Sequence, residues 1–299
     1  MSASDDPRPG TSRSGIVVVD KPAGLTSHQV VSRVRRAADT RKVGHAGTLD
    51  PMATGVLVLG VNRATRLLGH LMVTDKSYTG TIRLGASTVT DDAEGEVINT
   101  ADTSAITETM IRAAIEPFHG DIEQVPTQVS AIKINGVRSY ARVRSGEEVE
   151  LKARPVTVHR YDVAAVRRIE GFVDVDVEVD CTSGTYIRAL ARDLGGALGC
   201  GGHLTALRRT AVGPFTLDRS VTVDQLAERF SMINISEVAA ETFPVVQVSG
   251  TEVDDVRHGR ALPSLELSVL TAVFVGDEFL ALYKPSGRGA RAEAVFGAA

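Results

Sequence analysis

The chain has 299 residues, of which 43% are hydrophobic, so it can bury the core of one large domain plus a small one and is not expected to be disordered as a whole. The net charge of −4 argues against a nucleic-acid-binding protein, and two cysteines, Cys181 and Cys200, are too few for a disulfide framework and fit a reducing, cytoplasmic compartment. No apolar run approaches the roughly 20 residues of a membrane helix, and the polar segment 1–14 is expected to be a disordered leader because it lacks the apolar core of a secretory signal.

Charge is distributed unevenly along the chain. From Arg8 to Lys42 there are eight basic residues and two acidic ones, and from Asp91 to Glu123 there are nine acidic residues and one arginine. This segregation permits a basic face on an acidic body. An ordinary solvated surface would give the same pattern, so both interpretations stay open.

Apolar periodicity and turn residues predict the elements of the first half of the chain. The run Ile16–Val19 reads as a strand that enters a turn, and Thr26-Ser27 can cap the helix that follows. The segment 44–55 is rich in glycine, threonine and proline and should be a loop. The remaining expected elements are strands at 56–59 and 78–84, helices at 64–71 and 106–118, and a polar loop at 90–95.

The second half contains the clearest strand of the sequence. Between Val173 and Cys181, valine alternates with aspartate or glutamate in a strict period of two, so one face should be core and the other solvated. A turn at 182–185 then leads into a helix that carries Arg188. After about residue 241 only short strand-like pieces follow, at 245–248, 269–275 and 279–283.

These patterns predict an α/β fold of the α+β type in two parts. The main domain would span residues 15–241 and carry a basic, loop-like inserted segment at about 124–154. A small, mostly β domain would follow at 242–299.

Several signatures of cofactor and metal chemistry are missing from the sequence. Gly55 and Gly60 have the glycine spacing of a phosphate loop, but Val61 stands where that loop needs lysine. No GxGxxG, HExxH, CxxC or GxSxG pattern is present. These absences leave a cofactor-free, metal-free enzyme or a binding module.

Three side chains stand in places that a fold alone does not require. Asp50 lies between a flexible loop and an apolar strand, where a catalytic carboxylate could be held, although an Asp-Pro turn explains the same residues. Tyr78 opens a strand, where half-buried packing is the alternative explanation. Arg188 lies in the first turn of its helix, against the helix dipole, so it either has a fixed anionic partner or is a surface arginine.

Five ordered motifs resemble the bacterial TruB family of tRNA pseudouridine synthases over about residues 15–215. They are Asp20-Lys21-Pro22-x-Gly24-x-Thr26-Ser27, Gly44-His45-x-Gly47-Thr48-Leu49-Asp50-Pro51, Lys76-x-Tyr78 with Thr88-x-Thr90-x-Asp92-x-x-Gly95, Gly184-Thr185-Tyr186-Ile187-Arg188, and Leu204-x-x-Leu207-Arg208-Arg209. The chain departs from the family at Val129, where members often have a tyrosine, so contacts of the inserted segment are left unassigned. The segment 251–263 and the strands after it resemble a short RNA-binding domain of the PUA type.

The resemblance implies a fold, a reaction and a substrate. The fold would be a pseudouridine synthase domain around a mixed, largely antiparallel sheet, with a PUA-like domain at 242–299. The reaction would convert the T-loop uridine at tRNA position 55 to pseudouridine, after base flipping and without metal or cofactor. The resemblance implies a cytoplasmic monomer that binds the T stem-loop of tRNA and needs neither a membrane nor an obligate protein partner.

The resemblance also implies roles for single residues. Asp50 would be the essential carboxylate, either as a nucleophile or as the base that removes a ribose proton. Tyr78 would stack on the flipped uracil, and Arg188 would keep Asp50 ionised. The residues expected to bind substrate are His45, Tyr186, Leu207, Lys21, Lys133 and Arg208.

Two other functions compete with this one. The first is an RNA-binding protein or tRNA-folding chaperone without chemistry, which would have no need of Asp50, Tyr78 and Arg188 together. The second is a guide-RNA-dependent relative that modifies rRNA, against which the inserted basic segment 124–154 argues.

Overall fold

The computed structural model describes residues 14–127, 133–134, 137–138, 151–287 and 289–297, and their side chains except at 133, 134, 137 and 138. The first elements are β1 (Gly15–Lys21), α1 (Ser27–Ala37), β2 (Val43–His45), β3 (Thr54–Val61), the 3-10 helix η1 (Asn62–Arg66), α2 (Leu68–Leu71), β4 (Lys76–Leu84), β5 (Ala86–Thr88), β6 (Val97–Thr100), α3 (Glu108–Ile115), η2 (Glu116–Phe118) and β7 (Gly120–Gln124). Then come β8 (Lys133–Ile134), β9 (Val137–Arg138), β10 (Arg154–Ile169), β11 (Phe172–Cys181), α5 (Ile187–Ala197), β12 (Gly202–Val212), β13 (Phe215–Thr216), η3 (Leu217–Arg219), β14 (Val221–Thr222), α6 (Val223–Glu228), β15 (Ile233–Asn234) and α7 (Ile235–Thr242). The last are β16 (Val245–Gln247), α8 (Glu252–Arg257), β17 (Thr271–Val275), β18 (Glu278–Pro285) and β19 (Ala290–Val295).

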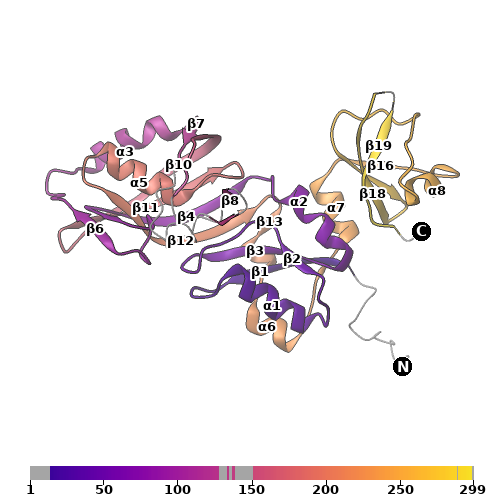
Figure 1. Cartoon of the computed structure of the whole chain (residues 1–299), viewed down its shortest axis with the longest axis horizontal. Coiled ribbons are helices and arrows are strands. Elements are labelled where there is room, and N and C mark those ends of the chain that lie inside the picture. Colours follow the sequence, from indigo (N-terminus) through magenta and orange to yellow (C-terminus); the bar gives the residue numbers. More distant parts are fainter. Residues whose placement is uncertain (1–13, 128–132, 135–136, 139–150, 288, 298–299) are drawn as a thin grey trace.

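A mixed sheet of 11 strands forms the centre of the main body (Figure 1). Its strand order is β14-β1-β3-β12-β4-β11-β10-β7, and β2, β13 and β15 pair beside this path. The β1–β14 and β3–β12 pairs are parallel, whereas the other pairs of this sheet are antiparallel. The expected α+β fold with a mixed, largely antiparallel sheet is therefore confirmed.

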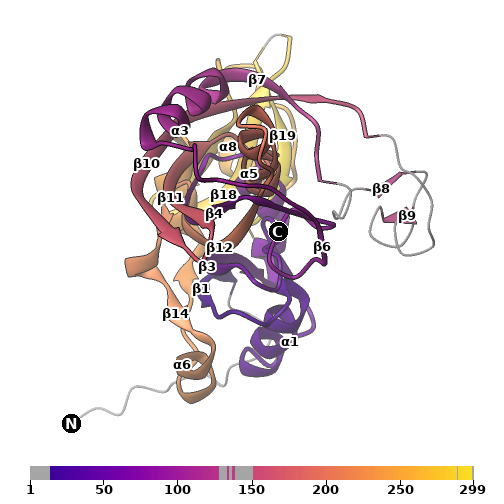
Figure 2. The same ribbon diagram turned by 90° about the vertical axis from the view of Figure 1, so that its left-hand side faces the viewer.

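Strands β1 and β3 are buried on both faces, which explains their continuous apolar sequences. One face packs on α1 and α6, where Val17 and Leu57 belong to the same cluster as Val34 and Leu226. The other face packs on η1, α2, α7 and the C-terminal strands. Figures 1 and 2 show α1 and α6 together at this end of the main body, away from α3 and α5.

Strand β11 is buried on one face only, as its alternating sequence predicts. Its valines pack with α3 and α5 in one core cluster. Its acidic residues lie on the opposite face, where Asp174 pairs with Arg83 at 2.7 Å and Asp180 pairs with Arg160 at 2.8 Å. Cross-strand ion pairs therefore cover the face of the sheet that helices leave open.

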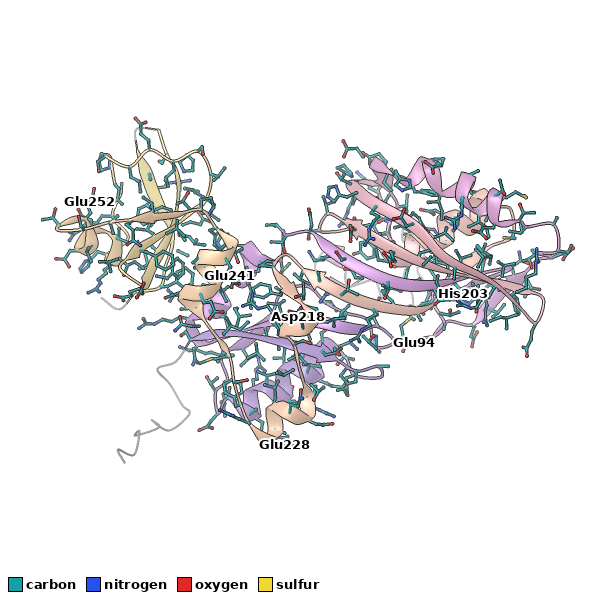
Figure 3. All side chains as sticks on the ribbon, turned by 180° about the vertical axis from the view of Figure 1, so that it is seen from behind. Glu94, His203, Asp218, Glu228, Glu241 and Glu252 are labelled. Atoms are coloured by element: carbon teal, nitrogen blue, oxygen red, sulfur yellow. The ribbon has the colours of Figure 1, made fainter. Side chains whose placement is uncertain are left out.

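The C-terminal residues form a second body around a four-stranded sheet in the order β16-β17-β18-β19. Phe279 stacks on Phe296 at a ring distance of 4.8 Å, and both belong to the apolar cluster that contains Val58 and Leu67 of the main body. Arg63 donates a hydrogen bond of 2.9 Å to the carbonyl of Phe296. The two bodies thus share a core, and α8, which carries Glu252, lies on the side away from it (Figure 3). Within the described part of the chain, no helix combines the length and apolar character needed to span a membrane.

Candidate active site

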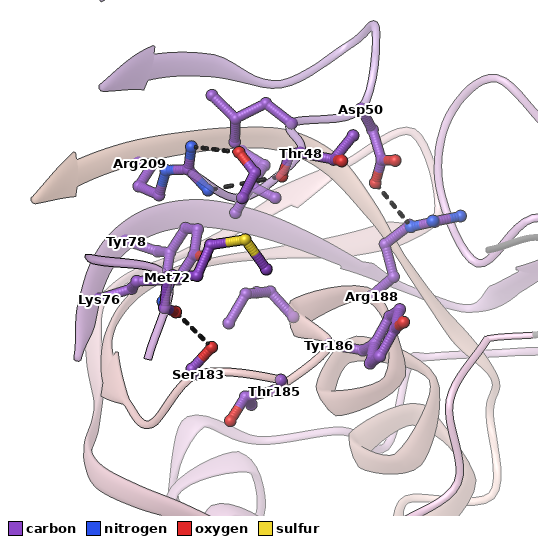
Figure 4. A pocket seen from close by; sticks show the side chains of 15 residues that line it. Thr48, Asp50, Met72, Lys76, Tyr78, Ser183, Thr185, Tyr186, Arg188 and Arg209 are labelled. Carbon is purple, nitrogen blue, oxygen red and sulfur yellow. Dashed lines mark hydrogen bonds and ion pairs between the residues drawn. The ribbon is translucent and has the colours of Figure 1, made fainter. Parts of the chain in front are cut away.

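A cavity of about 290 Å³ opens where the loop before β3, the start of β4, the turn into α5, and β12 meet (Figure 4). Its volume lies just below the roughly 300–1,000 Å³ that ligand pockets span. The residues that line it are Gly47, Thr48, Leu49, Asp50, Met72, Lys76, Tyr78, Ser183, Gly184, Thr185, Tyr186, Ile187, Arg188, Leu207 and Arg209. The structure therefore brings together Asp50, Tyr78 and Arg188, which are far apart in the sequence.

Arg188 has the anionic partner that its position predicted, and this partner is Asp50. The Nε atom of Arg188 lies 3.0 Å from Oδ2 of Asp50, and the arginine side chain is only 7% exposed. Helix α5 begins at Ile187, so this cation lies in the first helical turn, where it opposes the helix dipole. The ion pair offsets that unfavourable position and orients the carboxylate toward the cavity.

A second carboxylate, that of Asp92, holds the other side of Arg188. Its Oδ2 atom lies 3.2 Å from Nη1 of Arg188, which also donates a 2.8 Å hydrogen bond to the carbonyl of Thr90. Asp92 is 2% exposed and accepts a hydrogen bond from the backbone N–H of Glu94 at 3.1 Å. The sequence assigned no role to Asp92, because a loop of threonine and acidic residues has the composition of a solvated turn.

Opposing influences act on the pKa of Asp50. Burial raises the pKa above its ordinary value, and Arg188 is the largest influence that lowers it. Asp92 raises the pKa further, whereas Lys21 lowers it. Arg188 is therefore the main group that favours the ionised carboxylate.

Tyr78 lines the cavity from strand β4. Its side chain is buried, and burial raises the pKa of the phenol, which the nearby Arg209 guanidinium opposes. The phenol is thus protonated at neutral pH and offers an apolar ring with a hydroxyl at its end.

Two buried cations that the sequence did not single out, Lys76 and Arg209, border the cavity. The Nζ atom of Lys76 donates to the carbonyls of Met72 at 2.9 Å and Thr74 at 2.7 Å, and burial lowers the pKa of Lys76 to about 8. Arg209 is 1% exposed. Both residues belong to the quoted motifs, but nothing in their spacing distinguishes a buried cation from a surface one.

Two of the expected substrate-binding residues, Tyr186 and Leu207, line the cavity. The backbone of Tyr186 is fixed by the buried Gln124, which accepts from its N–H at 2.8 Å and donates to its carbonyl at 3.1 Å. His45 lies on β2 outside the cavity lining and is half-buried. Burial and the Arg209 charge lower its pKa, so its imidazole is largely neutral at pH 7.

Lys21 and Arg208, which were also expected to bind substrate, do not line the cavity. Lys21 is fully buried, and its Nζ atom donates to three carbonyls, among them that of Pro51 at 3.2 Å. Arg208 forms a two-pronged pair with Asp20, at 2.7 and 3.0 Å, outside the cavity lining. The side chain of Lys133 lies outside the described residues.

Among the residues that the structure describes, no three side chains of His, Cys, Asp or Glu come together as a possible metal site. The polar groups that border the cavity are instead one carboxylate, three cations and hydroxyls. These groups can hold a reacting group in place and stabilise its charge. They include a carboxylate that can act as a nucleophile or a base.

Comparison with protein families shows which family the chain belongs to. The model described as TruB family pseudouridylate synthase (N terminal domain) matches residues 35–187. The chain belongs to the TruB family. Two further models, the tRNA pseudouridylate synthase B C-terminal domain and the C terminal of tRNA pseudouridine synthase II, match residues 188–242 and 243–297. The TruB resemblance is confirmed, and the enzyme is a pseudouridylate synthase, an isomerase.

Relatives named tRNA pseudouridine synthase B match nearly the whole chain. The one from Arthrobacter sp. (strain FB24) is 58% identical over 276 residues, which cover 92% of this chain and 90% of the relative. The one from Cutibacterium acnes is 58% identical and covers 92% and 94%. The one from Rhodococcus jostii (strain RHA1) is 54% identical and covers 97% and 96%.

Chains of solved structures superpose on nearly the whole chain, including both bodies. A Cbf5-Nop10-Gar1 complex contains a chain that is 29% identical, with a TM-score of 0.71, and the match covers 95% of this chain and 85% of that one. An H/ACA RNP bound to a substrate RNA containing 2′-deoxyuridine contains a chain that is 27% identical, with the same TM-score and coverage. These similarities agree with the pseudouridine synthase fold.

Proposed function

We propose that this synthase isomerises the T-loop uridine at tRNA position 55 to pseudouridine. The observation that carries the proposal is the Asp50 carboxylate, held 3.0 Å from the buried Arg188 in a cavity that Tyr78 also lines. The relatives named tRNA pseudouridine synthase B support tRNA as the substrate class. Position 55 is what the family motifs imply.

The reaction needs no external reactant. The N-glycosidic bond of uridine breaks, the uracil turns, and its C5 atom joins C1′ of the same ribose. The proton that leaves C5 is balanced by one gained at N1, so atoms and charge are conserved. The target base must leave the helical stack to enter the cavity.

Each lining residue has a distinct task in this scheme. Ionised Asp50 acts either as the nucleophile at C1′ or as the base that removes a ribose proton, and Arg188 keeps it charged and oriented. The ring of Tyr78 stacks on the uracil, and its hydroxyl is available for proton transfer at C5. Tyr186 and Leu207 form the remaining walls around the flipped base.

Positively charged residues outside the cavity would hold the RNA backbone. Arg33 and Arg36 are exposed on α1, and Arg41 and Lys42 follow it at the surface. Arg35 instead donates to the carbonyl of Val43 at 3.1 Å. Exposed cations of this kind neutralise phosphates and set position without reading bases. We further propose that the PUA-like C-terminal body assists RNA binding and does no chemistry.

We also propose that the chain acts as a cytoplasmic monomer that needs no obligate protein partner. Cys181 and Cys200 are free and buried, which fits a reducing compartment. Nop10 and Gar1, the proteins found with the structural relative, belong to that assembly.

A site-mapping assay separates this proposal from its alternatives. Purified chain is mixed with unmodified tRNA transcript and with a matched transcript that carries cytidine at position 55. We expect one pseudouridine per molecule of the first transcript and none in the second. Tight binding without any pseudouridine would favour the chaperone, and modification only of rRNA with a guide RNA would favour the guide-dependent function.

A further inference from the structure

The side chain of Arg209 spans the two ends of the loop that carries Asp50. Its Nε donates to the carbonyl of Val56 at 2.7 Å, its Nη2 to that of Gly47 at 3.1 Å, and its Nη1 to that of Thr48 at 3.4 Å. These three carbonyls lie on both sides of Asp50 in the sequence. One guanidinium therefore closes the loop from 47 to 56, and Figure 4 shows its bonds at the 47–48 end.

The backbone of Arg209 contacts the same loop. Arg209 pairs with Gly55 in the parallel register of β12 and β3. Gly55 has a φ of +97°, and a Cβ atom there would lie 2.1 Å from the carbonyl oxygen of Arg209. Only glycine permits this approach, so the end of the loop rests directly on β12.

On its other side, Arg209 is the antiparallel partner of Tyr78. Directly opposed residues of an antiparallel pair point to the same face of the sheet, so the guanidinium and the phenol are neighbours. The Arg209 charge lowers the pKa of the Tyr78 phenol against the effect of burial. Arg209 thus contacts both the loop that carries Asp50 and the strand that carries Tyr78.

Stability alone is a weak reason for this arginine. Removing a guanidinium from water is costly, and this cost offsets much of what its three hydrogen bonds contribute to stability. What arginine adds is a rigid, planar set of donors that fixes several carbonyls at once. The charges that act most on the pKa of Asp50 belong to Arg188, Asp92 and Lys21, so the influence of Arg209 on Asp50 is geometric.

We infer that Arg209 is a positioning residue that fixes the Asp50 loop against the Tyr78 strand, so that both groups meet the same uridine. This inference rests on the proposed reaction. Geometry of this kind matters because a misplacement of about 1 Å lowers a rate by about 100-fold. Arg188 sets the charge of Asp50, and Arg209 sets the place of its loop.

The test compares Arg209→Met, Arg209→Lys and wild type, with Arg168→Met as the matched control. Arg168 also donates to three loop carbonyls, those of Thr103, Ser104 and Ile106, but it lies outside the cavity lining. Three quantities are measured: the single-turnover rate at saturating tRNA, the tRNA Kd, and hydrogen exchange of the peptide over residues 47–56.

We expect Arg209→Met to lower the rate by about 100-fold, to leave the Kd within about threefold, and to speed exchange of the 47–56 peptide. Arg209→Lys keeps the charge without the planar fork, so it should restore part of the rate. The acidic limb of the pH–rate profile should not move in either variant, in contrast to Arg188→Met. Arg168→Met should keep the wild-type rate and Kd.

A folded Arg209→Met protein with the wild-type rate, or with wild-type exchange of the 47–56 peptide, overturns the inference. So does a Kd that weakens as much as the rate, because Arg209 would then act on binding. If Arg209→Met does not fold, Arg209→Lys decides by the same criteria. An inactive wild type refutes the proposed substrate instead, and the exchange measurement still tests whether Arg209 holds the loop.

Discussion

The Nε atom of Arg188 lies 3.0 Å from the carboxylate of Asp50, and this contact is the largest influence that opposes the rise in the pKa of Asp50 on burial. The same guanidinium is anchored to Asp92, which is buried at 2% exposure. The charge and orientation of the Asp50 carboxylate therefore depend on Arg188, and Asp92 fixes the position of Arg188 in turn.

Replacement of Arg188 should slow the reaction and change its pH dependence. Arg188→Met removes the cation that lowers the pKa of Asp50, so the acidic limb of the single-turnover pH–rate profile should move to higher pH. Arg188→Lys keeps the charge and loses the fork, so the limb should move less while the rate still falls. A Met variant with the wild-type rate and profile would show that the ion pair has no part in the chemistry.

The raised pKa of Asp50 also predicts how stability depends on pH. Because the folded pKa lies above the unfolded value, the wild type should lose stability as pH rises from about 3.8 to the folded pKa, and this loss should persist above it. Asp50→Asn does not titrate. The Tm of Asp50→Asn relative to wild type should therefore increase between pH 4 and pH 8. A Tm difference that is constant or decreases over this range contradicts the assignment.

Charge reversal on α1 should weaken tRNA binding through electrostatics alone. Arg33→Glu with Arg36→Glu should raise the Kd at low salt, reduce the dependence of the Kd on salt, and spare the single-turnover rate at saturating tRNA. The exposed Arg112, which pairs with Glu108 on α3, provides the control Arg112→Glu. An equal loss of affinity in the control would mean that α1 contributes no specific contact.

Removal of the C-terminal body should affect stability and binding by separate routes. Truncation after Thr242 uncovers Val58 and Leu67 and should lower the Tm, weaken tRNA binding and spare the chemical step at saturating tRNA. Phe279→Ala keeps the body but opens the shared core, at a cost of about 3–5 kcal/mol, and should leave tRNA affinity unchanged where the protein is folded. A truncated protein that binds fully but is inactive would place catalytic groups beyond residue 242.

Periodicity predicts those parts of the fold whose strands are regular. The doubly buried β3 and the half-buried β11 are both found where the sequence placed them. The long strand β10 was not predicted, because register shifts between Val158 and Arg160 and between Val163 and Ala165 interrupt its alternation. The docking of Phe279 and Phe296 on the main body joins segments that are distant in the chain, which local patterns do not report.

In the site, too, local sequence patterns predict some side-chain contacts and not others. The helix position of Arg188 and the family motif together predict its contact with Asp50. The sequence does not distinguish the neighbours Arg208 and Arg209, although Arg208 pairs with Asp20 and Arg209 is buried. Alternation along a strand would normally tell which side chain faces the core, but a register shift after Arg209 interrupts it. The ammonium of Lys21 binds three carbonyls, one of which, that of Pro51, is 30 residues away in the sequence and is brought near only by the fold.

The measurement that tests the central claim most directly is single-turnover pseudouridine formation by wild type and by Asp50→Asn, on pre-folded, unmodified tRNA in the presence of EDTA. Wild type should convert the uridine at position 55 without added metal or cofactor. Asp50→Asn should give no detectable pseudouridine while its tRNA Kd stays within a few-fold of wild type, because the amide keeps the shape of the carboxylate and loses its charge. Turnover by a rigorously pure Asp50→Asn protein would contradict the assignment of Asp50 as the catalytic residue.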